Sequence, residues 1–173
     1  MIVVYGALGK IGAIVVAELL RSRQEVLPVD IGLNQDHDLI EDCTLIWCAT
    51  SPPPHETMKP FADDALAFIN VLSASWQRVI FTSSFGIEDG NGVRAINPYA
   101  ACKIASEAFL EAWCRGDNRR SGISIRMGGF GPLTPPGSPV VMSELEVVQC
   151  YIKALTMPHG FHVQRPLVER SAG

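Results

Sequence analysis

The fold is decided by residues 2–12, which read Ile2-Val3-Val4-Tyr5-Gly6-Ala7-Leu8-Gly9-Lys10-Ile11-Gly12. The first four are apolar and have the composition of a short buried strand. The next seven carry glycine at the first, fourth and seventh positions and run into an apolar helix expected over residues 13–23. Such glycines allow a tight turn and a close approach of a pyrophosphate, whose charge the amino end of the helix attracts. This stretch therefore predicts a nucleotide-binding turn, although a plain strand-to-helix turn is the alternative interpretation.

Short apolar strands and amphipathic helices alternate along the rest of the chain. We expect strands over residues 25–29, 44–49, 78–82, 122–127 and 161–164. We expect helices over residues 60–73, 99–114 and 143–155, with a helical turn over residues 39–43 and a loop over residues 86–95. This alternation is typical of an α/β fold, in which helices cover both faces of a parallel sheet. Without a repeat or linker, the 173 residues predict a single domain over residues 1–173.

Composition excludes several classes of function. With 14 basic and 18 acidic residues the net charge is −4, and the absence of a basic tract argues against nucleic-acid binding. The sequence contains no run of about 20 apolar residues, so no membrane span is predicted. The five cysteines are scattered, which favours a reducing compartment, and we expect a cytoplasmic protein. His159 and His162 lack further ligands at a useful spacing, so no metal site is expected.

Tyr99 and Lys103 are four residues apart in a segment that should begin a helix. Asn97 is a good N-cap and Pro98 suits the first helical position. Residues at this spacing share one face of a helix, so the ammonium should favour the phenolate and lower the pKa of Tyr99. A tyrosine tuned in this way can pass a proton to or from an alcohol or carbonyl. A solvated surface pair is the alternative when the motif is taken by itself.

Asp30 ends the second expected strand, 18 residues after Gly12. A carboxylate there can accept hydrogen bonds from the hydroxyls of an adenosine ribose and would repel a 2′-phosphate, which favours NAD over NADP. Because Lys10 lies within the glycine turn, NADP stays an alternative cofactor. An ordinary aspartate in a turn is the alternative.

Together these motifs resemble the short-chain dehydrogenase/reductase superfamily, in the form of its extended branch, which includes NAD-dependent epimerases and dehydratases. Four motifs carry the resemblance in the expected order over residues 2 to about 132. They are the spacing of Gly6, Gly9, Ile11 and Gly12; the strand ending in Ser83-Ser84; the run from Asn97 through Lys103 to Glu107; and Arg126-Met127-Gly128-Gly129-Phe130-Gly131-Pro132, in which Gly129 replaces the family's asparagine.

The resemblance implies a Rossmann-like, doubly wound parallel sheet in three layers, and it implies roles for individual residues. Tyr99 would be the general acid/base, and Lys103 would bond the nicotinamide ribose. Ser84 would orient the substrate oxygen, as the second serine of its pair, with Ser83 held in reserve. The cofactor would be lined by Tyr99, Lys103 and a further set: Gly6, Leu8, Gly9, Lys10, Ile11, Gly12, Asp30, Ala49, Thr50, Ser51 and Phe130.

The chain also departs from the family pattern. Only about 14 residues separate Asp30 from the strand at Leu45, so we expect one element to be missing after the second strand. This first stretch of the chain, with Cys48 to Pro52, also resembles the compact Rossmann units of prephenate dehydrogenases. Only 41 residues follow Pro132, too few for a full substrate domain. We therefore expect a small, sugar-like substrate acted on by an NAD(P)-dependent oxidoreductase or epimerase. The alternatives are a cofactor-sensing or scaffold protein without catalysis and the cofactor-binding subunit of a two-chain enzyme.

An outward apolar set on the helix bearing Tyr99 predicts a homodimer. Its members are Ile104, Ala108, Phe109 and Ala112. A second copy, or a different partner subunit, could complete the substrate pocket.

Overall fold

A six-stranded parallel sheet forms the middle of the computed structural model, which describes residues 1–30, 42–50, 57–89, 92–130 and 141–165. The strands are β1 (Ile2–Tyr5), β2 (Val26–Val29), β3 (Cys43–Trp47), β4 (Trp76–Ser84), β7 (Ser121–Met127) and β10 (Gly160–Gln164). Their order is β10-β7-β4-β3-β1-β2, and every neighbouring pair is parallel. This confirms the expected doubly wound α/β fold.

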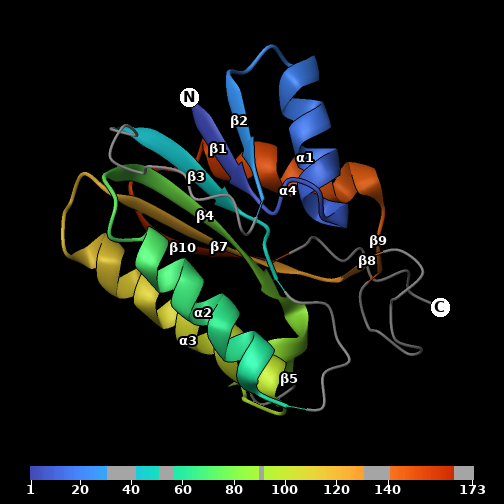
Figure 1. Ribbon diagram of the computed structural model, residues 1–173, viewed down its shortest axis with the longest axis vertical. Helices are drawn as coiled ribbons and strands as arrows, with labels where there is room; N and C mark the ends of the chain where they lie inside the picture. Colours follow the sequence, from blue (N-terminus) through green and yellow to red (C-terminus); the bar gives the residue numbers. More distant parts are fainter. Residues whose placement is uncertain (31–41, 51–56, 90–91, 131–140, 166–173) are drawn as a thin grey trace.

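Two pairs of helices sandwich the sheet (Figure 1). On one face lie α2 (Lys59–Val71) and α3 (Pro98–Arg115), and on the other lie α1 (Lys10–Arg21) and α4 (Glu144–Leu155). Because side chains alternate along a strand, each strand serves two cores. Ile46 of β3 packs toward α1 and α4, whereas Leu45 and Trp47 pack toward α2 and α3.

Short elements decorate the edge at which the strands end. The 3-10 helix η2 (Phe85–Ile87) follows β4 and leads into an antiparallel hairpin of β5 (Glu88–Asp89) and β6 (Gly92–Val93). The strands β8 (Gly129–Phe130) and β9 (Val141–Met142) pair in parallel. The segment expected as a loop over residues 86–95 therefore contains regular structure in its described part.

Several boundaries differ from expectation, and three of them have a local cause. Helix α1 begins at Lys10 rather than residue 13, because Gly9 already serves as its N-cap. Strand β4 continues to Ser84, because β7 pairs with it as far as Met127. Cys43 begins β3 instead of ending a helical turn; the rest of that predicted turn, up to residue 41, lies outside the described residues.

The strand order has a switch point at the carboxyl edge of the sheet. The chain passes from β1 to β2 on one side and reaches β3 on the other side of β1, so the connections diverge there. Ligands of doubly wound sheets bind at such a point. In the part of the chain that the structure describes, β2 forms the outer edge, and only residues 30–42 connect it to β3, as the predicted loss of an element requires.

Among the helices described, none has the length and apolar character that crossing a bilayer requires.

Candidate active site at the carboxyl edge of the sheet

The glycine turn joins β1 to α1 and is shaped by contacts within the chain itself. Gly6 has a φ of +77°, and a Cβ there would lie 2.6 Å from the backbone nitrogen of Ala49. A Cβ on Gly12 would lie 2.0 Å from the carbonyl oxygen of Gly6. Both positions thus require glycine for folding alone. At exposed Gly9, by contrast, a Cβ would meet only the Gly6 oxygen, at 3.2 Å.

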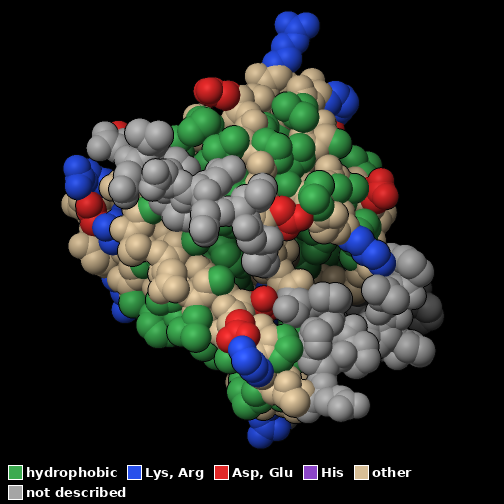
Figure 2. Space-filling view, viewed as in Figure 1, with side chains coloured by type: hydrophobic (Ala, Val, Ile, Leu, Met, Phe, Trp, Pro, Cys, Tyr) green, Lys and Arg blue, Asp and Glu red, His purple; other side chains and the backbone are tan. Residues whose placement is uncertain are grey.

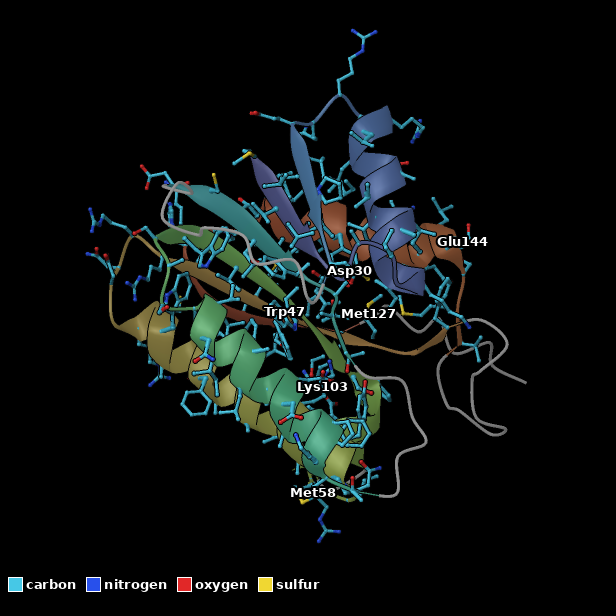
Figure 3. The ribbon with its side chains drawn as sticks, in the orientation of Figure 1. Asp30, Trp47, Met58, Lys103, Met127 and Glu144 are labelled. Atoms are coloured by element: carbon cyan, nitrogen blue, oxygen red, sulfur yellow. The ribbon has the colours of Figure 1, made fainter. Side chains whose placement is uncertain are left out.

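The surroundings of this turn fit a dinucleotide. Gly9 is the N-cap of α1, so the turn presents backbone N–H groups without a capping side chain, as a pyrophosphate site requires. Leu8, which is 83% exposed, and Lys10 lie on the surface. Ile11, in the first turn of α1, packs against the core between the sheet and helices α1 and α4. Asp30 follows β2 at the same edge (Figure 3). The ribose role of its carboxylate stays a prediction.

Tyr99 stands at the amino end of α3, near Ser84. The Asn97 side chain accepts a hydrogen bond from the Ala100 N–H at 2.8 Å, and Pro98 is the first helical residue, as expected. The Ser84 side chain lies close enough to the Tyr99 hydroxyl to influence its pKa. Phe61 of α2 meets the Tyr99 ring edge-on, with 5.6 Å between the ring centroids. The end of β4 and the start of α3 thus bring a serine and a phenol together.

The expected lowering of the Tyr99 pKa is wrong for the protein without a ligand. Burial raises the pKa of this phenol above its usual 10, the Ser84 side chain acts in the opposite direction, and Asp64 adds to the rise. The helical spacing places the Lys103 ammonium 5.6 Å from the centroid of the Tyr99 ring, over its face rather than at its hydroxyl. Tyr99 is therefore a neutral phenol at pH 7.

Lys103 is buried, with only 6% of its surface exposed. Its Nζ donates a hydrogen bond to the Thr82 carbonyl at 2.8 Å and lies 4.9 Å from the centroid of the Phe81 ring. The Thr82 carbonyl is available because β3 pairs with β4 only as far as Trp47 and Phe81. Burial lowers the pKa of Lys103 from 10.5 to about 8, although neighbouring groups, Asp64 first among them, act to raise it.

A pocket of about 10 Å³, the size of one water site, lies between this corner and α2. Ala49 and Thr50 line it from the end of β3, together with Tyr99 and Lys103. Asp64 contributes a carboxylate from α2. Figure 3 shows Lys103 between the helices and the sheet, with Trp47 near it. Ser51, the remaining residue predicted for this segment, lies outside the described residues.

Two predicted site residues lie apart from this corner. Ser83 is buried toward Glu107, whose pKa it helps to lower, although its Oγ makes no well-formed hydrogen bond with the described residues. Phe130 is half-buried and packs into the core formed with α1 and α4. The geometry therefore brings Ser84, and not Ser83, to Tyr99.

A buried ion network supports the corner from behind. The Arg126 guanidinium donates to Glu107 at 2.6 Å and 3.1 Å and also pairs with Glu88, while Ser124 donates to Glu107 at 2.7 Å. Burial alone would raise the pKa of Glu107, but these hydrogen bonds bring it below its usual range. Since Glu88 follows η2 and Glu107 lies on α3, the network ties the segment after Ser84 to the helix that carries Tyr99.

Sequence reasoning missed Phe61, Asp64 and the Thr82 carbonyl. Phe61 and Phe68 mark the buried face of α2, and Asp64 lies between them at helical spacing. A carboxylate on the inner side of an amphipathic helix is the signal that could have found it. A backbone acceptor such as Thr82 has no sequence signal. The described residues contain no group of His, Cys, Asp and Glu side chains that could hold a metal ion.

No protein-family model matches the sequence, and no curated protein resembles it. Solved structures do. MoeE5 in complex with UDP-glucose and NAD has a TM-score of 0.77 and 21% identity, over 95% of this chain and 75% of that one. The UDP-N-acetylglucosamine 4-epimerase from Bacillus cereus has a TM-score of 0.77 and 12% identity, over 95% and 77%. A mutated uronate dehydrogenase has a TM-score of 0.77 and 17% identity, over 98% and 74%. The chain thus shares its fold with epimerases and dehydrogenases of the short-chain dehydrogenase/reductase type, several of which hold NAD in their structures.

Proposed function

We propose that the chain binds NAD along the carboxyl edge of the sheet and acts on a hydroxyl or carbonyl of a small, sugar-like substrate, as an NAD(P)-dependent oxidoreductase or epimerase. The observation that carries the proposal is the corner of Ser84, Tyr99 and Lys103. Three buried or half-buried polar groups converge there from two elements, at the point where a doubly wound sheet binds its ligand. A purely structural corner would be more stable with apolar side chains.

In this proposal, residues along the edge would hold the two ends of the cofactor and its pyrophosphate. The turn from Gly6 to Gly12 would hold the pyrophosphate, and Asp30 would accept the adenosine ribose hydroxyls. Lys103 keeps donors beyond the one used by Thr82 and would reach the nicotinamide ribose. NAD, when bound, would exchange a hydride with a substrate carbon.

The chain's own residues would handle the proton. Because Tyr99 is neutral, it can donate its phenolic proton to a carbonyl oxygen, and Ser84 can donate a second hydrogen bond to the same oxygen. The ammonium of Lys103 would stabilise the phenolate left behind. In the reverse direction, the phenolate would take the proton from a hydroxyl.

Cofactor titration tests the proposal. Calorimetric titration with NAD and NADP should give a Kd below the millimolar range, with NAD the tighter ligand. Turnover would then be followed as NADH formation across a panel of UDP-sugars, uronates and small hydroxy acids. Tyr99→Phe should lower turnover by about 10²-fold or more with little change in the NAD Kd. Tyr5→Phe, which removes a hydroxyl from β1, is the matched control.

The results separate the competing functions. Tight NAD binding without turnover of any substrate, in a chain purified without a partner, would favour a sensing or scaffold role. A stoichiometric partner that restores turnover would favour a two-chain enzyme. Absence of binding by either dinucleotide would overturn the proposal. All five cysteines are unpaired, in keeping with a proposed place in the cytoplasm.

We also propose that two copies pair through the outer faces of α2 and α3. These helices pack side by side, and hydrophobic side chains lie over them at the lower left of Figure 2. Leu66 is 56% exposed and Phe109 is 48% exposed. Phe109→Glu should convert a dimer to a monomer in sedimentation velocity, whereas Leu20→Glu, at a site 57% exposed on the opposite face of the sheet, should not. A wild-type monomer would contradict this pairing.

A further inference from the structure

Asp64 is a carboxylate on the inner side of α2, and it lines the same small pocket as Tyr99 and Lys103. Its neighbour in sequence behaves differently. Asp63 is exposed and forms an ion pair with Lys59 at 2.6 Å, one turn away on the same helix. The two adjacent carboxylates therefore face different surroundings, solvent for Asp63 and the pocket that Lys103 also lines for Asp64.

The ammonium of Lys103 is surrounded by few charges. Its immediate contacts are two aromatic rings and a backbone carbonyl. These groups attract a cation, but they carry no negative charge that would neutralise it. Titratable groups face it from three elements: Asp64 from α2; Tyr99, Cys102 and Glu107 from α3; and Cys48 from the end of β3. Tyr99 is neutral, and burial raises the pKa of both cysteines, so neither is charged at pH 7.

Two carboxylates remain in that set, and of these Asp64 lines the pocket beside Lys103 whereas Glu107 does not. Glu107 is held by two hydrogen bonds from Arg126 and one from Ser124. Asp64, accordingly, is the strongest of the groups that favour the charged form of Lys103. Asp64 lies on α2 and Lys103 on α3, so the carboxylate would act on the ammonium from the α2 side of the pocket.

We propose that Asp64 is the counter-ion that keeps Lys103 cationic at neutral pH, and that it acts as a positioning residue for the site. Its link to catalysis rests on the proposed function, whereas its link to the charge of Lys103 does not. Lys103 must carry a proton to donate to a ribose and to stabilise a tyrosinate. Without Asp64, a larger fraction of Lys103 would be neutral at pH 7 to 8.

The charge of Lys103 can be measured directly, with no ligand. The chain contains four lysines, Lys10, Lys59, Lys103 and Lys153, so selective ¹³C labelling of the lysine side chains gives four ε-methylene signals. Lys103→Met identifies the signal of interest. In Asp64→Asn, the titration midpoint of Lys103 should move down by about one pH unit. Asp63→Asn, the matched control, should leave it in place, and Asp64→Glu should largely restore it.

A midpoint that is unchanged in Asp64→Asn, or that moves equally in Asp63→Asn, would overturn the proposal. Asp64→Ser is a second variant without the charge, should the asparagine variant fold poorly. Loss of the fold in both would also overturn it, since a lysine can release its proton and needs no counter-ion to fold. If NAD binds, its Kd should increase as the pH is raised, and this increase should begin at a lower pH in Asp64→Asn than in the wild type. If NAD fails to bind the wild type, the proposed function fails while the lysine titration still decides the role of Asp64.

Discussion

The glycine turn of residues 6–12 and the corner of Ser84, Tyr99 and Lys103 occupy two parts of the same edge, yet they differ in what their residues do for the folded chain. Gly6 and Gly12 are required by close backbone contacts, whether or not a cofactor binds. Lys103 is the reverse case, because its burial opposes its charge and destabilises the fold. A sequence motif that folding itself requires is weak evidence for a ligand. A costly buried charge at the edge of a sheet is stronger evidence.

The largest effect should come from the turn, and it should be an effect on folding. Gly12→Ala places a Cβ 2.0 Å from the Gly6 oxygen, a contact that only a backbone shift can relieve. We expect the free energy of unfolding to fall by about 4 kcal/mol or more, enough for a large fraction of the molecules to be unfolded. Urea denaturation followed by circular dichroism measures it. A loss under about 1 kcal/mol would break the comparison, since the turn would then not be fixed by packing.

Lys103→Met should have an opposite and smaller effect on stability. The shift from 10.5 to about 8 corresponds to about 3 kcal/mol of destabilisation at pH 7, at about 1.4 kcal/mol per unit. Methionine avoids that cost but loses the hydrogen bond to Thr82, worth about 1 kcal/mol. The variant should therefore be more stable by about 2 kcal/mol at pH 7, as measured by urea denaturation, while NAD binding weakens.

The pH dependence of this difference follows from proton binding. Between pH 8 and 10.5 the unfolded chain holds the Lys103 proton more tightly than the folded chain, so the stability of the wild type rises with pH through this window. The advantage of the Met variant should be full below pH 8 and gone by about pH 10.5. A constant advantage across that range would mean that Lys103 is not a buried cation.

Gly9→Ala should have the smallest effect on folding and a selective effect on binding. Its Cβ would meet only the Gly6 oxygen, at 3.2 Å, and alanine is a poorer N-cap, so stability should fall by about 1 kcal/mol. The added methyl group lies where a pyrophosphate would approach, so the NAD Kd should rise about tenfold, or about 1.4 kcal/mol. Calorimetric titration measures it, and an unchanged Kd would place the dinucleotide elsewhere.

The same contrast explains what the sequence could predict. Strand β1, the turn and the start of α3 were predictable because their signals are local: apolar runs, glycine spacing, and the cap formed by Asn97 and Pro98. The parallel sheet covered by helices on both faces followed from the alternation of strands and helices. The pKa of Tyr99 could not be predicted, because a helical spacing of four says nothing about burial against Phe61 and α2. Asp64 and Thr82 reach Lys103 only through tertiary packing.

Strand β10 has a consequence for how the chain is made. It is synthesised after every other strand of the sheet, yet it pairs with β7 along Ser121 to Ile125. Until it emerges, β7 exposes one row of unpaired backbone N–H and C=O groups beside an apolar core. We therefore expect the nascent chain to pass through an aggregation-prone interval that ends when β10 docks, with chaperones most useful in that interval.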